Sequence, residues 1–259
     1  MPVPLTAALI CFNDSAHLGD TLDSVSFCSD VVIADLGSTD GSIDIARGRG
    51  ARVFDHPWVP NSPMAREFLL SHVQTDWVVS LDPDMRFPAG AVDVIQGLIT
   101  ENPQLAIIGM PYQNYFGDKL LRYGRWGGIK THFPGIVNQR RIEVIEVDHR
   151  GHYRPKPGFD YISLPPVPDM AFQHHWVESW QHLLNKQRLY LPGEVAARWD
   201  EGLRATTWSR VWRPLRTFLW SLVWRRGFLD GFTGIGLSAI AGWYEAKVQG
   251  GLAGRARVS

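Results

Sequence analysis

Two aspartates that follow a short apolar run are the residues most able to do chemistry. Trp77–Leu81 predicts a buried strand, and Asp82-Pro83-Asp84 comes directly after Leu81. Residues two apart on a strand point to the same side, so we expect the two carboxylates to lie side by side. Like charges that close repel unless something positive lies between them, and a hard divalent cation with a diphosphate supplies that charge. The alternative is a loop with two solvated aspartates.

Asp35 and the Asn13-Asp14 pair stand at the ends of two further apolar runs, Val31–Ala34 and Thr6–Phe12. A carboxylate there can accept hydrogen bonds from a nucleobase or a ribose, whereas Asn13-Asp14 taken alone is typical of a helix cap. Open α/β sheets bind ligands at the edge where the carboxyl ends of parallel strands meet. We therefore expect one group of residues to converge at that edge: Asn13, Asp14, Asp35, Arg66, Asp82 and Asp84.

Strand and helix patterns alternate along the first 110 residues. Short apolar runs predict strands, and apolar residues at helical spacing, such as Leu18, Leu22 and Val25, predict the helices between them. The predicted strands are Thr6–Phe12, Val31–Ala34, Ala51–Phe54, Trp77–Leu81 and Ala106–Met110. This alternation indicates an α/β fold, a Rossmann-like and mostly parallel sheet with helices on both faces.

The pattern changes after residue 110. A strand or a hairpin is expected over 136–147, the proline-rich stretch 151–169 is expected to be largely loop, and helical spacing returns from His174. We expect an α/β half over 1–110, an irregular region of the same domain over 111–200, and a helical tail over 201–259. Five aromatic residues leave two readings open, a wall that stacks on a sugar or simple core packing: Tyr112, Tyr115, Phe116, Tyr123 and Trp126.

Composition excludes several classes of protein. A hydrophobic share of 45% excludes a disordered chain, and 26 basic against 26 acidic residues give no reason to expect a nucleic-acid partner. Cys11 and Cys28 are too few for a disulfide scaffold and favour a reducing compartment. The start of the chain lacks the basic region of a signal peptide, and no stretch reaches the roughly 20 apolar residues of a membrane span. We therefore expect a cytoplasmic protein.

The three strand ends together resemble the inverting glycosyltransferases of family 2, which have the GT-A fold. The resemblance rests on Asn13-Asp14, on residues 31–41 around Asp35, and on residues 76–84. Within the family, the chain looks most like the branch of short enzymes that includes lipopolysaccharide-core β-glucosyltransferases. Two later segments are similar to that branch: His174-His175 through Tyr190, and Gly227-Phe228-Leu229-Asp230-Gly231.

The resemblance implies that a sugar passes from a nucleotide-diphospho-sugar, first of all a UDP-sugar, to a glycan, lipopolysaccharide-core or lipid-linked acceptor. It implies that Asp35 binds the base with help from Asn13 and Asp14, and that Arg66 neutralises the diphosphate. It further implies that Asp82 contacts the ribose or the metal and that Asp84 ligates Mg²⁺ or Mn²⁺. His175 is a further candidate for the metal shell.

The catalytic base is where the sequence departs from the family pattern. Related enzymes carry a His-Glu pair in the middle region, whereas this chain has Asp148-His149-Arg150. Asp148 is the nearest substitute for the glutamate and is the base that we predict, with Glu146, Asp160 and Asp169 as alternatives. The departure also leaves open an altered acceptor or an inactive member of the family.

Two other functions fit parts of the pattern. A sugar-1-phosphate nucleotidyltransferase can share the sheet, but it normally has a basic, glycine-rich loop after the first strand, and residues 15–19 lack the basic residue. A non-catalytic scaffold that keeps the fold agrees with the missing glutamate and conflicts with the retained Asp35, Asp82 and Asp84.

Arginine and tryptophan alternate between Arg204 and Arg226, a segment without Asp or Glu. Pro214 is expected to divide it into two helices, the second with an apolar side that includes Leu215 and Leu222. Such a side, flanked by Arg and Trp, is typical of a helix that lies in a membrane interface. We expect peripheral attachment to an anionic surface on the inner face of the cytoplasmic membrane. The alternative is packing on the sheet or in a dimer, with the arginines solvated.

Overall fold

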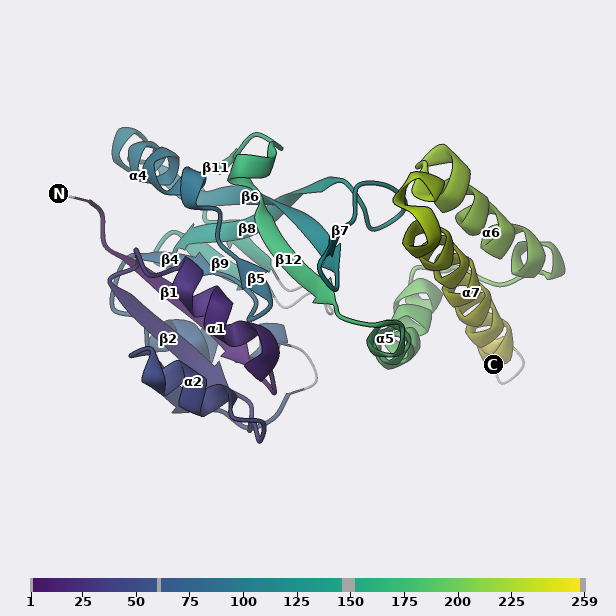
Figure 1. The fold of residues 1–259 in the computed structure, drawn as a ribbon, viewed down its shortest axis with the longest axis horizontal. Helices are drawn as coiled ribbons and strands as arrows, with labels where there is room; N and C mark the ends of the chain where they lie inside the picture. The colour runs from purple at the N-terminus through teal and green to yellow at the C-terminus, as the bar shows by residue number, and fades with distance from the viewer. Residues whose placement is uncertain (1, 60–61, 146–151, 257–259) are drawn as a thin grey trace. The chain divides into compact units, whose positions relative to one another are not determined.

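The computed structural model describes residues 2–59, 62–145 and 152–256 (Figure 1). The chain forms two compact units. The first, which we call the α/β unit, comprises Met1–Gln113 and Ile129–His174, and the second, the helical unit, comprises Asn114–Gly128 and His175–Ser259.

The first part of the α/β unit alternates strands and helices as the sequence predicts. Its strands are β1 (Leu5–Cys11), β2 (Asp30–Asp35), β3 (Arg52–Asp55) and β4 (Trp77–Ser80). Its helices are α1 (Ser15–Ser24), α2 (Ser42–Gly48), α3 (Arg66–Ser71) and α4 (Val92–Glu101). β1 pairs in parallel with β2 and β4, and β2 pairs in parallel with β3. The carboxyl ends of these strands therefore lie along one edge.

The remaining strands make the sheet mixed. They are β5 (Met85–Arg86), β6 (Leu105–Phe116), β7 (Lys119–Leu120), β8 (Ile129–Asn138), β11 (Asp160–Ser163) and β12 (Phe172–Val177). The main path of the sheet runs β3-β2-β1-β4-β8-β6-β12-β5. β6 is longer than the strand predicted over 106–110. β8 lies antiparallel between β4 and β6, so β6 does not pair with β4.

Helices cover both faces of the sheet because consecutive strand residues point to opposite sides. Leu9 and Ile33 pack with Leu18 of α1 and Ile95 of α4 in one core. Val32 and Val78 pack with Leu69 of α3 in the other. Within the α/β unit, α1 and α2 lie on the same side of β1 and β2 (Figure 1). The α/β class, mostly parallel around β1 and with a helical C-terminal region, is confirmed.

Two local predictions after residue 150 are wrong. The proline-rich stretch is not largely loop, because it contains β10 (His152–Pro155), which pairs with β9 (Ile142–Ile145), and β11, which pairs in parallel with β6. His174 does not begin a helix but lies in β12, and helix begins only at Trp180. β10 forms a hairpin with β9, whereas β11 and β12 pair with β6 and β5, strands distant in the sequence that local periodicity does not reveal.

The helical unit contains α5 (Trp180–Asp200), α6 (Thr207–Leu219), the π-helical turn η5 (Trp220–Trp224), the 3-10 turn η6 (Gly227–Asp230) and α7 (Gly231–Arg255). Contrary to the prediction, Pro214 does not divide the segment but lies inside α6. α6 packs closely on α7 around this proline, since a Cβ at Gly242 would lie 3.1 Å from the Pro214 carbonyl oxygen. We attribute the tolerance of Pro214 to this packing, which must outweigh a cost of about 3 kcal/mol. Within the described parts of the chain, no helix is long and apolar enough to cross a bilayer.

Candidate functional site

Asp82 and Asp84 lie on a tight turn at the carboxyl end of β4. The Met85 N–H donates to the Asp82 carbonyl oxygen at 3.0 Å, which closes a four-residue turn with Pro83 in its second position, where proline is favoured. The Thr21 hydroxyl of α1 anchors the turn by donating to the Pro83 carbonyl at 2.6 Å. The two carboxylates are therefore neighbours because of a turn and not, as predicted, because of strand alternation.

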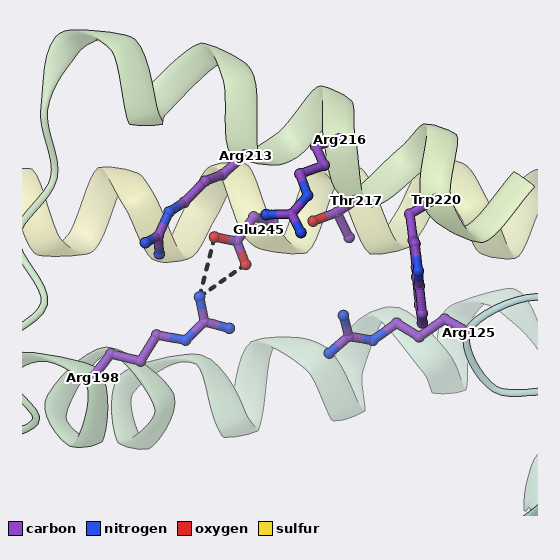
Figure 2. A pocket seen from close by; sticks show the side chains of 7 residues that line it. All are labelled: Arg125, Arg198, Arg213, Arg216, Thr217, Trp220 and Glu245. Carbon is purple, nitrogen blue, oxygen red and sulfur yellow. Dashed lines mark hydrogen bonds and ion pairs between the residues drawn. The ribbon is translucent and has the colours of Figure 1, made fainter. Parts of the chain in front are cut away.

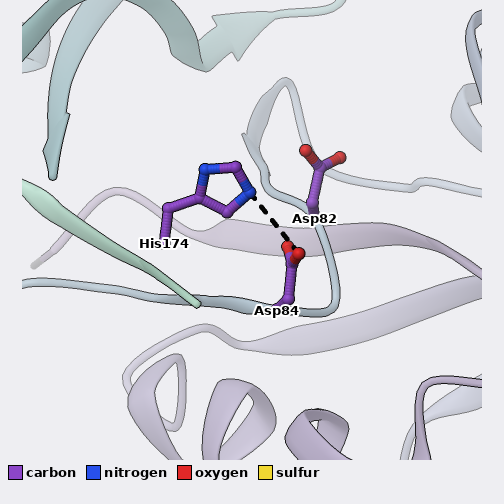
Figure 3. Close-up of side chains that lie close together, drawn as sticks. All are labelled: Asp82, Asp84 and His174. Atoms are coloured by element: carbon purple, nitrogen blue, oxygen red, sulfur yellow. Dashed lines mark ion pairs between the residues drawn. The ribbon is translucent and has the colours of Figure 1, made fainter. Parts of the chain in front are cut away.

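His174 joins the two aspartates through the pairing of β5 with β12. These strands are antiparallel, with His174 opposite Met85, the residue that follows Asp84. His174 Nε2 lies 3.4 Å from an Asp84 carboxylate oxygen (Figure 3). One side-chain N or O atom from each of Asp82, Asp84 and His174 can be chosen so that all three lie within 4.8 Å of one another. Two carboxylates and an imidazole at this spacing form a candidate metal site.

Asp14 belongs to the same acidic environment. Its pKa is raised from 3.8 to about 6, mainly by burial and then by the charges of Asp84 and Asp82, although a hydrogen bond from the Phe12 N–H opposes the rise. Asp14 stands at the start of α1, yet its side chain does not cap the helix and accepts the Phe12 N–H at 2.9 Å instead. Three acidic side chains so close together favour a bound cation or a bound proton.

Asp35 and Asn13 organise the loops beside this cluster. The Asp35 carboxylate is buried at the end of β2 and accepts hydrogen bonds from the Gly37 N–H at 3.2 Å and the Ser38 hydroxyl at 2.6 Å. Asn13 adopts a left-handed backbone, with φ 58°, and its side-chain oxygen accepts the Thr39 N–H at 2.8 Å. The loops after β1 and β2 are thus fastened together at the strand ends.

Arg66 reaches toward the carboxyl end of β4 through an aromatic neighbour. It is the first residue of α3, and its Cζ atom lies 5.2 Å from the centre of the Tyr153 ring. The Tyr153 hydroxyl lies 3.3 Å from Ser80 Oγ, the last residue of β4. Arg66 Nε is buried and has no hydrogen-bond acceptor among the described residues. A buried guanidinium N–H in this state is a donor suited to an anionic ligand.

The candidate bases are separated by the fold. Asp148 and Glu146 lie outside the described residues. Asp160 pairs with Leu105 at the amino end of β6, the edge of the sheet opposite to Asp82 and Asp84, so it does not converge with them. Asp169 lies in a short 3-10 turn, η4 (Pro168–Met170).

A family model decides which group of proteins the chain falls into. The model for "Glycosyl transferase family 2" matches residues 6–156, more than half of the chain and all of the strand ends described above. The chain belongs to glycosyl transferase family 2.

Curated relatives are named as glycosyltransferases. The chain is 28% identical over 174 residues to the lipopolysaccharide core biosynthesis glycosyltransferase LpsC of Rhizobium meliloti, a match covering 59% of this chain and 64% of that protein, less than two thirds of its length. It is 24% identical over 246 residues to the uncharacterized glycosyltransferase RP128 of Rickettsia prowazekii, covering 89% of this chain and 80% of that one. Among solved structures, glucosyl-3-phosphoglycerate synthase from Mycobacterium tuberculosis has a TM-score of 0.36 at 22% identity over 45% of each chain.

The glycosyl transferase family 2 resemblance pointed to His175, but the histidine beside the aspartates is His174. Consecutive residues on a strand point to opposite sides, and the His175 ring stacks on Tyr115 with ring centroids 4.9 Å apart. Tyr153 was also missed. Tyr112, named as a candidate sugar-stacking residue, lies near Asp82, because burial and the charge of Asp82 raise the pKa of its hydroxyl. The alternation of Phe172, His174 and Trp176 is the sequence signal that could have revealed β12.

The aromatic residues for which a sugar-stacking wall and core packing were both open make contacts within their own units. Tyr112 packs edge-on against His174 at 5.9 Å. In the helical unit Phe116 lies on Trp180 at 4.5 Å and Trp126 on Trp176 at 5.1 Å. These contacts account for Phe116 and Trp126 as packing residues.

Proposed function

We propose that this protein is a metal-dependent inverting glycosyltransferase that moves a sugar from a nucleotide-diphospho-sugar, in the first place a UDP-sugar, to a glycan, lipopolysaccharide-core or lipid-linked acceptor. The observation that carries the proposal is the Asp82–Asp84–His174 cluster at the carboxyl end of β4. Ligands of open α/β sheets bind at this edge, and a divalent cation that also binds the diphosphate would offset the surplus of negative charge there.

The residues of the cluster fit a divalent cation. Asp82 and Asp84 offer hard carboxylate oxygens, which suit both Mg²⁺ and Mn²⁺. The imidazole of His174 adds a nitrogen donor, which favours Mn²⁺ because Mg²⁺ prefers oxygen ligands. When bound, the cation would stabilise the negative charge that develops on the departing diphosphate.

The other residues of the site bind and orient the donor in this proposal. Arg66 offers a guanidinium to the diphosphate from the start of α3, in a position fixed by the Tyr153 ring. Asp35 and Asn13 shape the pocket for the base, since they hold the loops that follow β1 and β2. Burial raises the pKa of Asp14 to about 6, and we assign this residue to the donor side of the site.

Proton removal from the acceptor hydroxyl requires a general base. We assign this role to Asp148, which follows β9 in the sequence and precedes β10. β9 and β10 pair antiparallel, and Tyr153 of β10 contacts Arg66, so this hairpin is linked to the donor site. Asp160 is excluded as the base by its position at the opposite edge of the sheet.

A donor screen tests the proposed activity. The protein is incubated with a panel of nucleotide sugars, with Mn²⁺, with Mg²⁺ or with EDTA, and release of the nucleoside diphosphate is measured. We expect slow hydrolysis of one UDP-sugar that requires a divalent cation and is faster with Mn²⁺. Asp148→Asn, assayed beside it, is expected to retain UDP binding in calorimetry and to lose turnover. Absence of both nucleotide binding and metal dependence would favour the non-catalytic scaffold.

We further propose that the helical unit attaches to an anionic membrane surface, where a lipid-linked acceptor would be presented. Hydrogen bonds from Ser209 to Gln249 and between Ser221 and Ser238, each 2.9 Å, fix which side of the α6–η5 segment faces α7. The opposite side is an exposed apolar stripe made of Trp208, Val211, Trp212, Leu215, Leu219 and Val223. Trp224 and Phe232 are 80% and 93% exposed in the same unit. Arg225 and Arg226 border them, and the composition is typical of an interfacial surface.

Vesicle sedimentation tests the attachment. The wild-type protein is expected to sediment with vesicles rich in phosphatidylglycerol at low salt, to be released as salt rises, and to ignore phosphatidylcholine vesicles. Replacing Trp224 and Phe232 by Ser should reduce binding at every salt concentration, whereas Arg225→Gln with Arg226→Gln should reduce it mainly at low salt. A matched pair outside the stripe, Trp58→Ser with Val94→Ser, serves as the control. Wild-type protein that stays in the supernatant with anionic vesicles at low salt would overturn the proposal.

A further inference from the structure

The helical unit contains a cavity of about 450 Å³ that is remote in sequence from the strand-end residues. Seven residues line it. Four of them are arginines, Arg125, Arg198, Arg213 and Arg216, and the others are Thr217, Trp220 and Glu245. The guanidinium groups come from α5, α6 and the 114–128 loop and point into one space (Figure 2). Its volume lies within the range of small-molecule sites, roughly 300–1,000 Å³.

The acidic groups at the cavity are already engaged. Glu245 accepts two hydrogen bonds from Arg198, at 3.1 and 2.9 Å, and one from Gln249 at 2.9 Å. Glu194, which is outside the lining, forms a 2.7 Å ion pair with the other side of Arg198. Arg198 is thereby held in place, because both of its partners are themselves on helices. These contacts make Arg198 a fixed wall of the cavity.

Arg213 and Arg216 have no such partners. Neither forms an ion pair with any carboxylate in the parts of the chain that the structure describes. They lie three residues apart on α6, so their side chains leave the same face of the helix. The two carboxylates near the cavity, Glu194 and Glu245, are both paired with Arg198, so neither neutralises Arg213 or Arg216. An anion that bridges the arginines would remove their mutual repulsion.

The chemistry of the remaining lining narrows the class of anion. Guanidinium groups hydrogen-bond in forks to the oxygens of phosphates and carboxylates. Thr217 adds a hydroxyl, and the Trp220 ring forms a flat wall of the kind on which a sugar ring stacks. We propose that this cavity binds a sugar phosphate through its phosphomonoester group. Binding of the sugar phosphate does not depend on transferase activity. The assignment of this ligand as the phosphorylated end of the acceptor rests on the transferase function proposed above.

Calorimetry with the full chain, without donor or metal, tests the site. The probes are glucose 6-phosphate and glucose. We expect saturable binding of glucose 6-phosphate at one site and none of glucose. Arg213→Gln with Arg216→Gln should weaken that binding by at least about 10-fold, since each change removes a charged hydrogen-bond donor. Arg188→Gln with Arg210→Gln removes two exposed arginines of the same unit from outside the cavity and should change affinity less than about threefold.

A vesicle arm distinguishes a lipid-borne phosphate from a soluble one. Phosphatidic acid carries a phosphomonoester and phosphatidylglycerol a phosphodiester, and the two vesicle types are matched in zeta potential. A preference for phosphatidic acid that Arg213→Gln with Arg216→Gln abolishes supports a lipid-borne ligand. Saturable binding of glucose 6-phosphate without that preference supports a soluble one. The proposed site is overturned if neither glucose 6-phosphate nor phosphatidic acid binds saturably. It is also overturned if the two arginine double variants weaken that binding equally. Because no donor is present, loss of transferase activity would not affect these results.

Discussion

Asp84→Ala is expected to lower metal-dependent sugar transfer by about 10²–10³-fold while the protein stays folded. The Asp84 carboxylate lies 3.4 Å from His174 Nε2 at the centre of the candidate metal site. Its loss would leave one carboxylate and one imidazole to hold the cation that balances the charge on the leaving diphosphate. The measurement is turnover of the UDP-sugar at saturating Mn²⁺, together with thermal unfolding with and without the ion.

The unfolding arm separates a site effect from a folding effect. Asp84 adds to the negative charge felt by Asp14, so its removal relieves repulsion, and the melting temperature of the metal-free variant should not fall. The stabilisation that Mn²⁺ confers on the wild type, about 2.7 kcal/mol at 100 times the dissociation constant, should disappear. Asp76→Ala is the matched control, because Asp76 precedes the same strand at its other end and pairs with Arg140 at 2.8 Å. If Asp84→Ala keeps more than half of wild-type activity, the metal assignment is wrong.

Asp35→Ala is expected to weaken UDP binding by roughly 10–150-fold, the equivalent of about 1.5–3 kcal/mol for a hydrogen bond to a charged group. Asp35 is 6% exposed and holds the loop after β2 through Gly37 and Ser38. Its removal therefore takes away a base contact in the proposed site and also loosens the loop that shapes the pocket. Calorimetry with UDP in the presence of Mn²⁺ measures the loss.

Pyrophosphate is the control ligand for Asp35→Ala. It shares the diphosphate of UDP and lacks the nucleoside, so its affinity should be unchanged if Asp35 acts on the base side of the donor. A parallel fall in pyrophosphate affinity would mean that the variant damages the whole site. Unchanged UDP affinity would place the nucleotide elsewhere.

The order of strands and helices up to residue 110 was predictable because its signals are local. Apolar runs such as Val31–Ala34 end in a polar residue, and parallel strands bring those ends to one edge. Asn13, Asp35, Asp82 and Asp84 could thus be grouped from the sequence alone. Their types, carboxylate and amide at the ends of neighbouring strands, also indicated a cation and a nucleotide as the matching chemistry.

The third member of the cluster could not be predicted in the same way. His174 reaches Asp84 only because β12 pairs antiparallel with β5 in a register that sets His174 opposite Met85. β5 has two residues, too few for any periodicity. The contact of Arg66 with Tyr153 likewise depends on the β9–β10 hairpin packing beside α3. In the helical unit, the convergence of Arg198 with Arg213 and Arg216 requires α5 and α6 to face one cavity.

The sequence by itself determined the parallel strands, the acidic strand ends and the family to which they belong, because each depends on neighbours along the chain. Tertiary structure decided which histidine joins the aspartates. It also placed Asp160 at the edge of the sheet opposite to Asp82 and Asp84, and it kept Pro214 inside a helix. Those outcomes depend on strand register and on helix packing between segments up to about ninety residues apart in the sequence, where a shift of one residue turns a side chain to the opposite face.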